Sequence, residues 1–309
     1  MKKKLLIAVG DCIYSKQAVK YAARMTSGVK DVSYTLFNVQ PLLPRIFRQA
    51  AETDPKVNAE LHVLVEKNTE VGRCASRELK DIMVREGIPQ NRVEVVSQPM
   101  QVGMAKDILN RAEQGSYYGI ILARRALTPS RDFFIGTTAA KVVEHAIDIP
   151  VWVVDGKTIS MRIMLAVDGS ENSLRDIDHL INIIGANPDL KLTLFHVLPY
   201  LRHYYSVDFE RENPRLQEVL EREGKRRMDD FYENAYQKLQ AAGLTRDQIE
   251  MKARIGGYDI STCILEEART GQYSTVVVGR RGERDAFFTG RIAMRLVQKV
   301  ADQTLWVVP

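Results

Sequence analysis

The chain has 309 residues, a length that allows about two domains of roughly 150 residues each. A hydrophobic fraction of 45% and a charged fraction of 27% are ordinary for a globular protein and argue against a disordered or fibrous chain. The net charge of +5 is spread over mixed helix faces, so we expect no nucleic-acid partner. No run approaches the ~20 apolar residues of a membrane span, and three scattered cysteines indicate a reducing cytoplasm.

Short β-branched runs alternate with amphipathic segments along the first half of the chain. Strands are predicted near residues 5–9, 32–39, 92–96, 119–123 and 150–154, with four helices between them. These runs lack polar alternation, which is typical of strands buried on both faces of a parallel sheet. The stretch after the second strand, 41–60, is predicted to be a long insertion: a lid, a partner surface or a plain surface loop. The second half has a corresponding insertion at 199–215.

The second half repeats the first. Four segments recur in the same order: LLIAV (5–9) as IMLAV (163–167), TLFNVQP (35–41) as TLFHVLP (193–199), IILARR (120–125) as VVVGRR (276–281) and PVWVVD (150–155) as TLWVVP (304–309). Such self-similarity predicts a duplication, with domain 1 at 1–156 and domain 2 at 160–309. Each domain is expected to be an open, five-stranded parallel sheet with helices on both faces.

In an open parallel sheet, ligands bind beyond the carboxyl ends of the strands, so the residues that follow the strands are the candidates. In the second copy, Asp168 follows the first strand, and Gly279 and Gly282 follow the fourth. Glycines at this place let the backbone turn tightly and approach a ligand closely. Gly290 precedes the last helix, whose free amide groups would form an anion site. The Asp168 carboxylate is suited to accept hydrogen bonds from an adenine or a ribose.

These residues resemble the universal stress protein family over nearly the whole chain, twice. The segments that carry the resemblance are AVDGS (166–170), LFHVLP (194–199) and VVVGRRG (276–282), and in the first copy AVGDCIYS (8–15), LFNVQP (36–41) and GTTAAKVVEHA (136–146). The resemblance implies a Rossmann-like sheet in each copy and pairing of the two domains through their last strands. It also implies that some members bind ATP through Gly-x2-Gly-x9-Gly-Ser/Thr, with adenine contacted by the Asp after strand one and the Val ending strand two.

Each copy keeps a different part of this motif. The second copy keeps the Asp, the Val and all three glycines. However, only seven residues separate Gly282 from Gly290 where the motif has nine, and Arg291 replaces Ser or Thr. The first copy keeps the spacing and the final Gly-Thr, but two alanines replace glycines and Gly10 replaces the Asp. The favoured nucleotide site is therefore in domain 2: Asp168, Gly169, Val197, Gly279, Arg280, Gly282, Gly290 and Arg291. The weaker second site is in domain 1: Val39, Ala123, Ala126, Gly136, Thr137 and Thr138.

Some of these residues have more than one interpretation. Thr137 and Thr138 are predicted to be helix caps rather than ligands. The recurring pairs at 124–125 and 280–281 either contact phosphate or form a salt-bridged domain interface. His196, on the second strand of copy two, is interpreted as a structural histidine rather than a base.

Nothing in the sequence argues for an enzyme. It has no GxxxxGK[ST] loop, no GxGxxG after a first strand, no metal-ligand spacing and no recognisable nucleophile–base set. We interpret the chain as a cytoplasmic tandem universal stress protein for stress response or signalling. We expect ATP or another adenine nucleotide in at least one domain, domain 2 being favoured, and association of two chains into a homodimer. The alternative is a scaffold or interaction protein of the same fold without a nucleotide, and weak ATP hydrolysis stays open.

Overall fold

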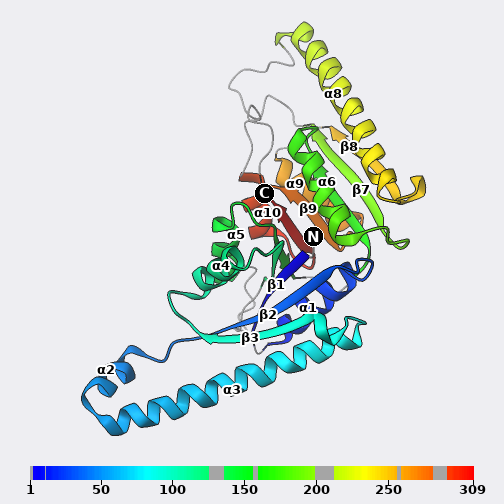
Figure 1. Ribbon diagram of the computed structural model, residues 1–309. Helices are drawn as coiled ribbons and strands as arrows, with labels where there is room; N and C mark the ends of the chain where they lie inside the picture. The colour runs from blue at the N-terminus through cyan, green and yellow to red at the C-terminus, as the bar shows by residue number, and fades with distance from the viewer. Residues whose placement is uncertain are drawn as a thin grey trace. The chain divides into compact units, whose positions relative to one another are not determined.

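The computed structural model divides the chain into two compact units, Met1–Asp155 (unit 1) and Gly156–Pro309 (unit 2). The structure describes residues 3–10, 12–124, 136–155, 159–198, 212–255, 259–280 and 291–309. Both units are α/β sheets with flanking helices, as the sequence predicts (Figure 1). Within these ranges, no helix is long and apolar enough to cross a membrane.

Unit 1 contains one parallel sheet of five strands. Its elements are β1 (Lys3–Val9), α1 (Ile13–Met25), β2 (Val32–Gln40), α2 (Arg45–Thr53), α3 (Pro55–Arg85), the 3-10 turn η1 (Gln90–Arg92), β3 (Val93–Pro99), α4 (Met104–Gln114), β4 (Gly119–Ala123), α5 (Thr137–His145) and β5 (Val151–Val154). The strand order is β3-β2-β1-β4-β5, and every pair is parallel. The order therefore reverses direction between β1 and β4, where a ligand crevice is expected.

The first and last strands of unit 1 contain continuous buried apolar runs. Leu5, Leu6 and Ile7 of β1 are completely buried, as the absence of polar alternation predicts. Trp152 of β5 is also fully buried. Its ring packs edge to face against that of Tyr21, with the two ring centroids 6.4 Å apart. The core thus extends from the first strand to the last.

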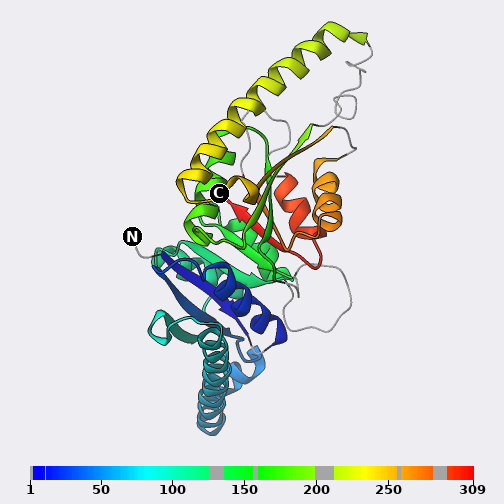
Figure 2. The same cartoon turned by 90° about the vertical axis from the view of Figure 1, so that its right-hand side faces the viewer.

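The insertion predicted at 41–60 is helical. Residues 45–53 form α2, and α3 begins directly afterwards at Pro55, which suits the first position of a helix. The Asp54 carboxylate caps α3 by accepting from the amide of Lys56 at 2.8 Å. Figures 1 and 2 show α2 and the far half of α3 extending beyond the sheet of unit 1, and this extension is called the arm below.

Unit 2 repeats this plan. Its elements are β6 (Arg162–Val167), α6 (Glu171–Ile184), β7 (Lys191–Leu198), α8 (Pro214–Ala241), the 3-10 turn η3 (Arg246–Gln248), β8 (Ile249–Ile255), α9 (Ile260–Thr270), β9 (Thr275–Gly279), α10 (Arg291–Lys299) and β10 (Thr304–Val308). The strand order is β8-β7-β6-β9-β10, all parallel, which matches unit 1 strand for strand. Most of the insertion predicted at 199–215 lies outside the described residues.

The duplication reaches individual hydrogen bonds. In unit 1, the hydroxyl of Tyr117 donates to Oγ1 of Thr35 at 2.9 Å, and the Thr35 hydroxyl in turn donates to the carboxylate of Glu94 at 3.0 Å. In unit 2, Tyr273 donates to Thr193 at 3.0 Å, and Thr193 donates to Glu250 at 3.0 Å. Both chains of bonds lie toward the amino ends of the strands. We call them the Tyr–Thr–Glu networks.

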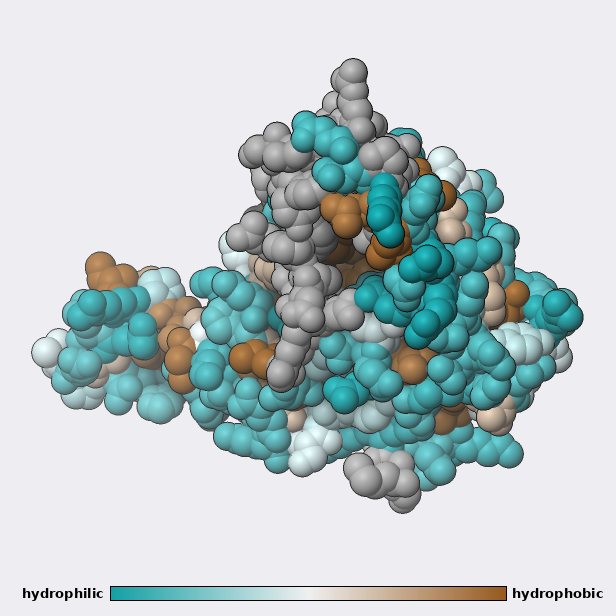
Figure 3. Space-filling model, turned by 90° about the horizontal axis from the view of Figure 1, so that it is seen from above, coloured by the Kyte–Doolittle hydropathy of each residue, from teal (hydrophilic) through white to brown (hydrophobic). Residues whose placement is uncertain are grey.

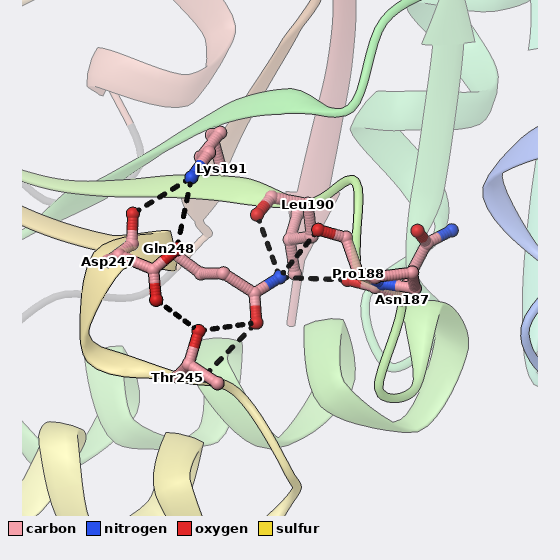
Figure 4. A network of polar contacts seen from close by, with 7 residues as sticks. All are labelled: Asn187, Pro188, Leu190, Lys191, Thr245, Asp247 and Gln248. Atoms are coloured by element: carbon pink, nitrogen blue, oxygen red, sulfur yellow. Dashed lines mark hydrogen bonds and ion pairs between the residues drawn. The ribbon is translucent and has the colours of Figure 1, made fainter.

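A second polar network fixes the start of β7 and β8 in unit 2 (Figure 4). The buried side-chain amide of Gln248 donates to the carbonyls of Asn187 and Leu190 at 2.9 and 3.0 Å. Its carbonyl oxygen accepts from the amide of Thr245 at 3.0 Å, which completes a capping box around η3. One glutamine therefore supplies partners to backbone groups of two separate turns.

Candidate functional site

Unit 1 contains a cavity of about 350 Å³ at the carboxyl ends of β1, β2 and β4. This is the edge of the sheet at which the strand order reverses. Val39 of β2, Gly10 after β1 and Ala123 of β4 line its floor, while Gly136 and Thr138 bound it where α5 begins. Of the six predicted residues in domain 1, the structure brings four together around this cavity. Thr137 opens α5 beside them, and Ala126 lies outside the described residues.

One hydrogen bond at the turn after the first strand recurs in both units. In unit 1 the amide of Gly10 donates to Oγ of Ser15 at 2.9 Å. In unit 2 the amide of Asp168 donates to Oγ of Ser173 at 3.1 Å, and Oδ1 of Asp168 accepts from that hydroxyl at 2.8 Å. Oδ1 also accepts from the amide of Ser170 at 3.0 Å. The Asp168 carboxylate therefore holds the start of α6.

The second strand ends in the same contact in both units, made by different side chains. Nδ2 of Asn38 donates to the carbonyl of Val9 at 3.1 Å, and Nδ1 of His196 makes the equivalent bond to Val167 at 2.9 Å. Burial lowers the pKa of His196, and the nearby charge of Arg227 lowers it further. His196 thus makes the structural contact expected of it.

The start of α5 differs from the prediction for its threonines. The N-cap is Gly136, and no side chain among the described residues caps this helix. Thr137 is the first helical residue, and Oγ1 of Thr138 contacts Sδ of Met104 at 3.7 Å. The cap prediction was wrong because the residue with extended backbone geometry is one position earlier, so both threonines stand inside the first turn. The backbone amides of that turn keep their capacity to bind an anion.

Arg124 forms an ion pair inside unit 1. Its Nη1 lies 2.9 Å from Oδ2 of Asp155, and the two side chains are 1% and 3% exposed. This ion pair links the ends of β4 and β5 within unit 1, and Arg124 also lines the cavity, so a phosphate contact stays a prediction. Its neighbour Arg125, like Arg281 in unit 2, lies outside the described residues.

The predicted residues of unit 2 are described only in part. Val197 on β7 and Gly279 at the end of β9 occupy the strand ends, as expected. The amide of Arg280 donates to the carbonyl of Val308 at 2.6 Å, as that of Arg124 does to Val154 in unit 1. Gly282 and Gly290 lie outside the described residues, and Arg291 is placed only as the first residue of α10.

The long helix after the second strand contributes residues that the motif did not indicate. In unit 2, Nη2 of Arg227 on α8 donates to the carbonyl of Asp168 at 2.7 Å. Gly169 has a φ of +79°, and a Cβ there would lie 2.8 Å from Sδ of Met228. In unit 1, Val71 and Gly72 of α3 line the cavity. An alignment of the two copies on the glycines that follow these helices, Gly87 and Gly243, matches Val71 with Arg227. This alignment is the sequence signal that could have pointed to these positions.

A buried acid lies close to the first turn of unit 2. Asp176 on α6 is 1% exposed, and Oδ1 has no hydrogen-bond partner. Burial raises its pKa well above the ordinary value, and the charge of Asp168 raises it further. Unit 1 has Ala18 at the matching place in α1. Within the described ranges, no three or more His, Cys, Asp or Glu side chains are grouped to hold a metal ion.

A family model described as the universal stress protein family matches the chain twice, over residues 1–155 and 160–309. The chain belongs to the universal stress protein family. No curated protein matches this family member. The tandem arrangement recurs in solved structures of similar length.

One such structure is a universal stress protein from Archaeoglobus fulgidus DSM 4304, with a TM-score of 0.62 and 16% identity, covering 100% of this chain and 98% of that one. A functionally unknown protein from Pseudomonas aeruginosa PAO1 has a TM-score of 0.58 and 13% identity, covering 100% and 92%. A putative universal stress protein from Pseudomonas aeruginosa UCBPP-PA14 has a TM-score of 0.57 and 13% identity, covering 99% and 92%. At these identities the likeness shows the shared fold.

Proposed function

We propose that this universal stress protein binds an adenine nucleotide in the crevice of at least one unit. The observation that carries the proposal is the cavity in unit 1, whose volume of about 350 Å³ lies within the range of roughly 300–1,000 Å³ typical of small-molecule sites. Its position at the reversal of strand order is where open parallel sheets bind nucleotides. In this proposal the protein acts as a stress-response or signalling module of the cytoplasm.

The two ends of the cavity suit the two ends of a nucleotide. Val39, Phe37 and Ile108 give apolar surface on which a planar base can lie. Gly136 and Thr138 belong to the start of α5, whose free backbone amides favour a phosphate group. Ala123 in place of the expected glycine brings a methyl group to this end, which weakens a close phosphate approach.

Unit 2 enters the proposal on different grounds. The sequence motif favours it, because it keeps Asp168 and the glycines at 279, 282 and 290. Arg227 adds a positive charge at the end of β6, where it would attract an anionic ligand. Pairing of the two domains through their last strands, and association of two chains, stay predictions from the sequence.

The proposal is tested by calorimetric titration of the full-length chain with ATP, with one blocking variant for each unit. A Cβ on Gly10 would meet nothing within 4 Å, so Gly10→Phe is expected to fill the unit 1 cavity without strain. Gly282→Val is the matched block for the motif of unit 2. Loss of binding in either variant locates the site, and the doubly blocked chain should give no heat. If the unmodified chain gives none and denaturation releases no adenine compound, the proposal fails.

One observation favours the alternative of an interaction scaffold. The arm of unit 1 exposes large apolar side chains: Ile46 at 70%, Phe47 at 49%, Val63 at 50% and Leu64 at 47%. Figure 3 shows apolar side chains among hydrophilic ones on its left, where the arm lies. Exposed apolar groups gathered on two consecutive helices are typical of interaction surfaces. A flat ATP titration together with concentration-dependent association that Phe47→Asp abolishes would support this second function.

A further inference from the structure

Helix α3 closes one end of the unit 1 cavity. A Cβ at Gly72 would lie 2.8 Å from Oδ1 of Asn38, so glycine is what lets α3 approach the end of β2 this closely. Asn68 precedes Gly72 by one helical turn and therefore lies on the same face of α3. It lines the cavity together with Val71. Because β2 is on the far side of β1 from β4, Asn68 stands at the end opposite the start of α5.

Three carboxamide side chains line this cavity, and two of them are held by the protein. Asn38 donates to Val9 and accepts from Oγ of Ser97 at 3.0 Å. Gln40 donates to the same Ser97 hydroxyl at 2.9 Å and accepts from Oγ1 of Thr69 at 3.0 Å. Asn68 is half-buried and makes no side-chain hydrogen bond within the described part of the chain. Its amide is the group left to meet a ligand.

The charges around the cavity point to recognition by a neutral group at this end. No carboxylate lines the cavity among the described residues, and Arg124 is engaged by Asp155 at the other end. A carboxamide offers one acceptor and two donors on a planar frame. That set matches the edge of adenine, which presents an amino donor beside a ring-nitrogen acceptor.

The two units carry their polar side chains at different positions around the crevice. The helices end alike, at Gly87 in unit 1 and at Gly243 in unit 2, each with a φ above +90°. Counting back equally from these glycines places Gly224 of α8 opposite Asn68. At these two positions, unit 2 thus has an acidic residue after its first strand and a glycine on the helix, while unit 1 has Gly10 after its first strand and the amide of Asn68 on the helix.

We propose that Asn68 is the base-reading residue of unit 1, bonding the polar edge of an adenine whose phosphates point toward α5. The proposal rests on the proposed nucleotide binding. Asn68 takes the role that the carboxylate after the first strand would have in unit 2. The ligand class is an adenine nucleotide rather than any purine nucleotide.

The test is calorimetric titration of the full-length Asn68→Leu variant, in the Gly282→Val background that blocks unit 2, with ATP and with the same triphosphate carrying a purine that lacks the 6-amino group. Losing a two-point contact to a base is expected to weaken ATP binding in unit 1 roughly 5- to 150-fold. The variant should bind the two nucleotides equally, whereas the Gly282→Val parent should prefer ATP. Asn58→Leu is the matched control, because Asn58 is an exposed asparagine of the same helix outside the cavity. It should change affinity by no more than about twofold.

Each contrary result has its own meaning. If the unmodified chain binds no ATP, both this inference and the proposed function are overturned. If it binds ATP and Gly10→Phe leaves that binding intact, nucleotide binding stands and the role of Asn68 is overturned. The same follows if Gly10→Phe removes binding while Asn68→Leu behaves like Asn58→Leu, or if Asn68→Leu keeps the preference for ATP.

Discussion

Replacing Asp155 by alanine should destabilise unit 1 far more than removal of a typical surface charge. The carboxylate lies 2.9 Å from the Arg124 guanidinium, and their side chains are 3% and 1% exposed. The variant leaves a buried positive charge without its counter-ion, which typically destabilises by about 3–5 kcal/mol. For a unit of this size, such a loss corresponds to a fall in Tm of roughly 6–20 °C.

The two tryptophans allow unit 1 to be followed by itself. Trp152 is in unit 1 and Trp306 is in unit 2, and the chain has no others. In a Trp306→Phe background, urea unfolding monitored by fluorescence therefore reports on unit 1. Because Trp152 is fully buried, its emission should shift clearly on unfolding.

Two further variants make the result interpretable. Asp178→Ala removes an equally close pair with Lys238, 2.7 Å apart, but these side chains are 47% and 39% exposed. In a Trp152→Phe background, where Trp306 fluorescence reports on unit 2, Asp178→Ala should lower the free energy of unfolding by less than about 1 kcal/mol. Combining Arg124→Met with Asp155→Ala removes both charges and should recover a large part of the loss. A loss below about 1 kcal/mol for Asp155→Ala, or no recovery in the double variant, would refute the argument.

Two other predictions concern unit 2, both followed through Trp306. The raised pKa of Asp176 means that the folded state favours the protonated acid, so its contribution to stability falls as pH rises above about 4, the unfolded value. Asp176→Asn should therefore gain stability over the parent progressively between pH 4.5 and 7.5 in urea unfolding, and a difference independent of pH would contradict the assignment. Gln248→Leu should lower stability by roughly 2–3 kcal/mol, because buried carbonyls lose their donor. Gln237→Leu on the exposed face of α8 is its control, and equal losses would show that the network in Figure 4 is unimportant.

The repeat and the strands could be predicted from the sequence because burial on both faces leaves continuous apolar runs. The predicted 32–39 became Val32–Gln40, and 119–123 became Gly119–Ala123. The insertion after β2 could not be assigned in this way. Its α2 has a short amphipathic pattern between prolines, and the charged start of α3 lacks the core-facing stripe that appears only from Gly72 onward.

The candidate site was predictable only as far as local motifs reach. Strand-end residues such as Val39 and Ala123 follow from topology, because parallel strands end at one edge. The contribution of α3 depends on Gly72 meeting Asn38, two residues far apart in the chain and without a shared motif. The pairing of Arg124 with Asp155 likewise joins two strand ends through space, so the arginine alone suggested either a phosphate ligand or a salt-bridged domain interface.

The Tyr–Thr–Glu networks have a consequence for how the two units diverged. They tie the sheet together at the amino ends of the strands, and they are the same in both units. Gly10 and Asp168, which differ between the units, follow the carboxyl ends of the first strands. Because these networks lie away from the crevice, each crevice could change independently after duplication without breaking the bonds that join the strands. Crevice residues transplanted from one unit to the other should accordingly yield folded chimaeras.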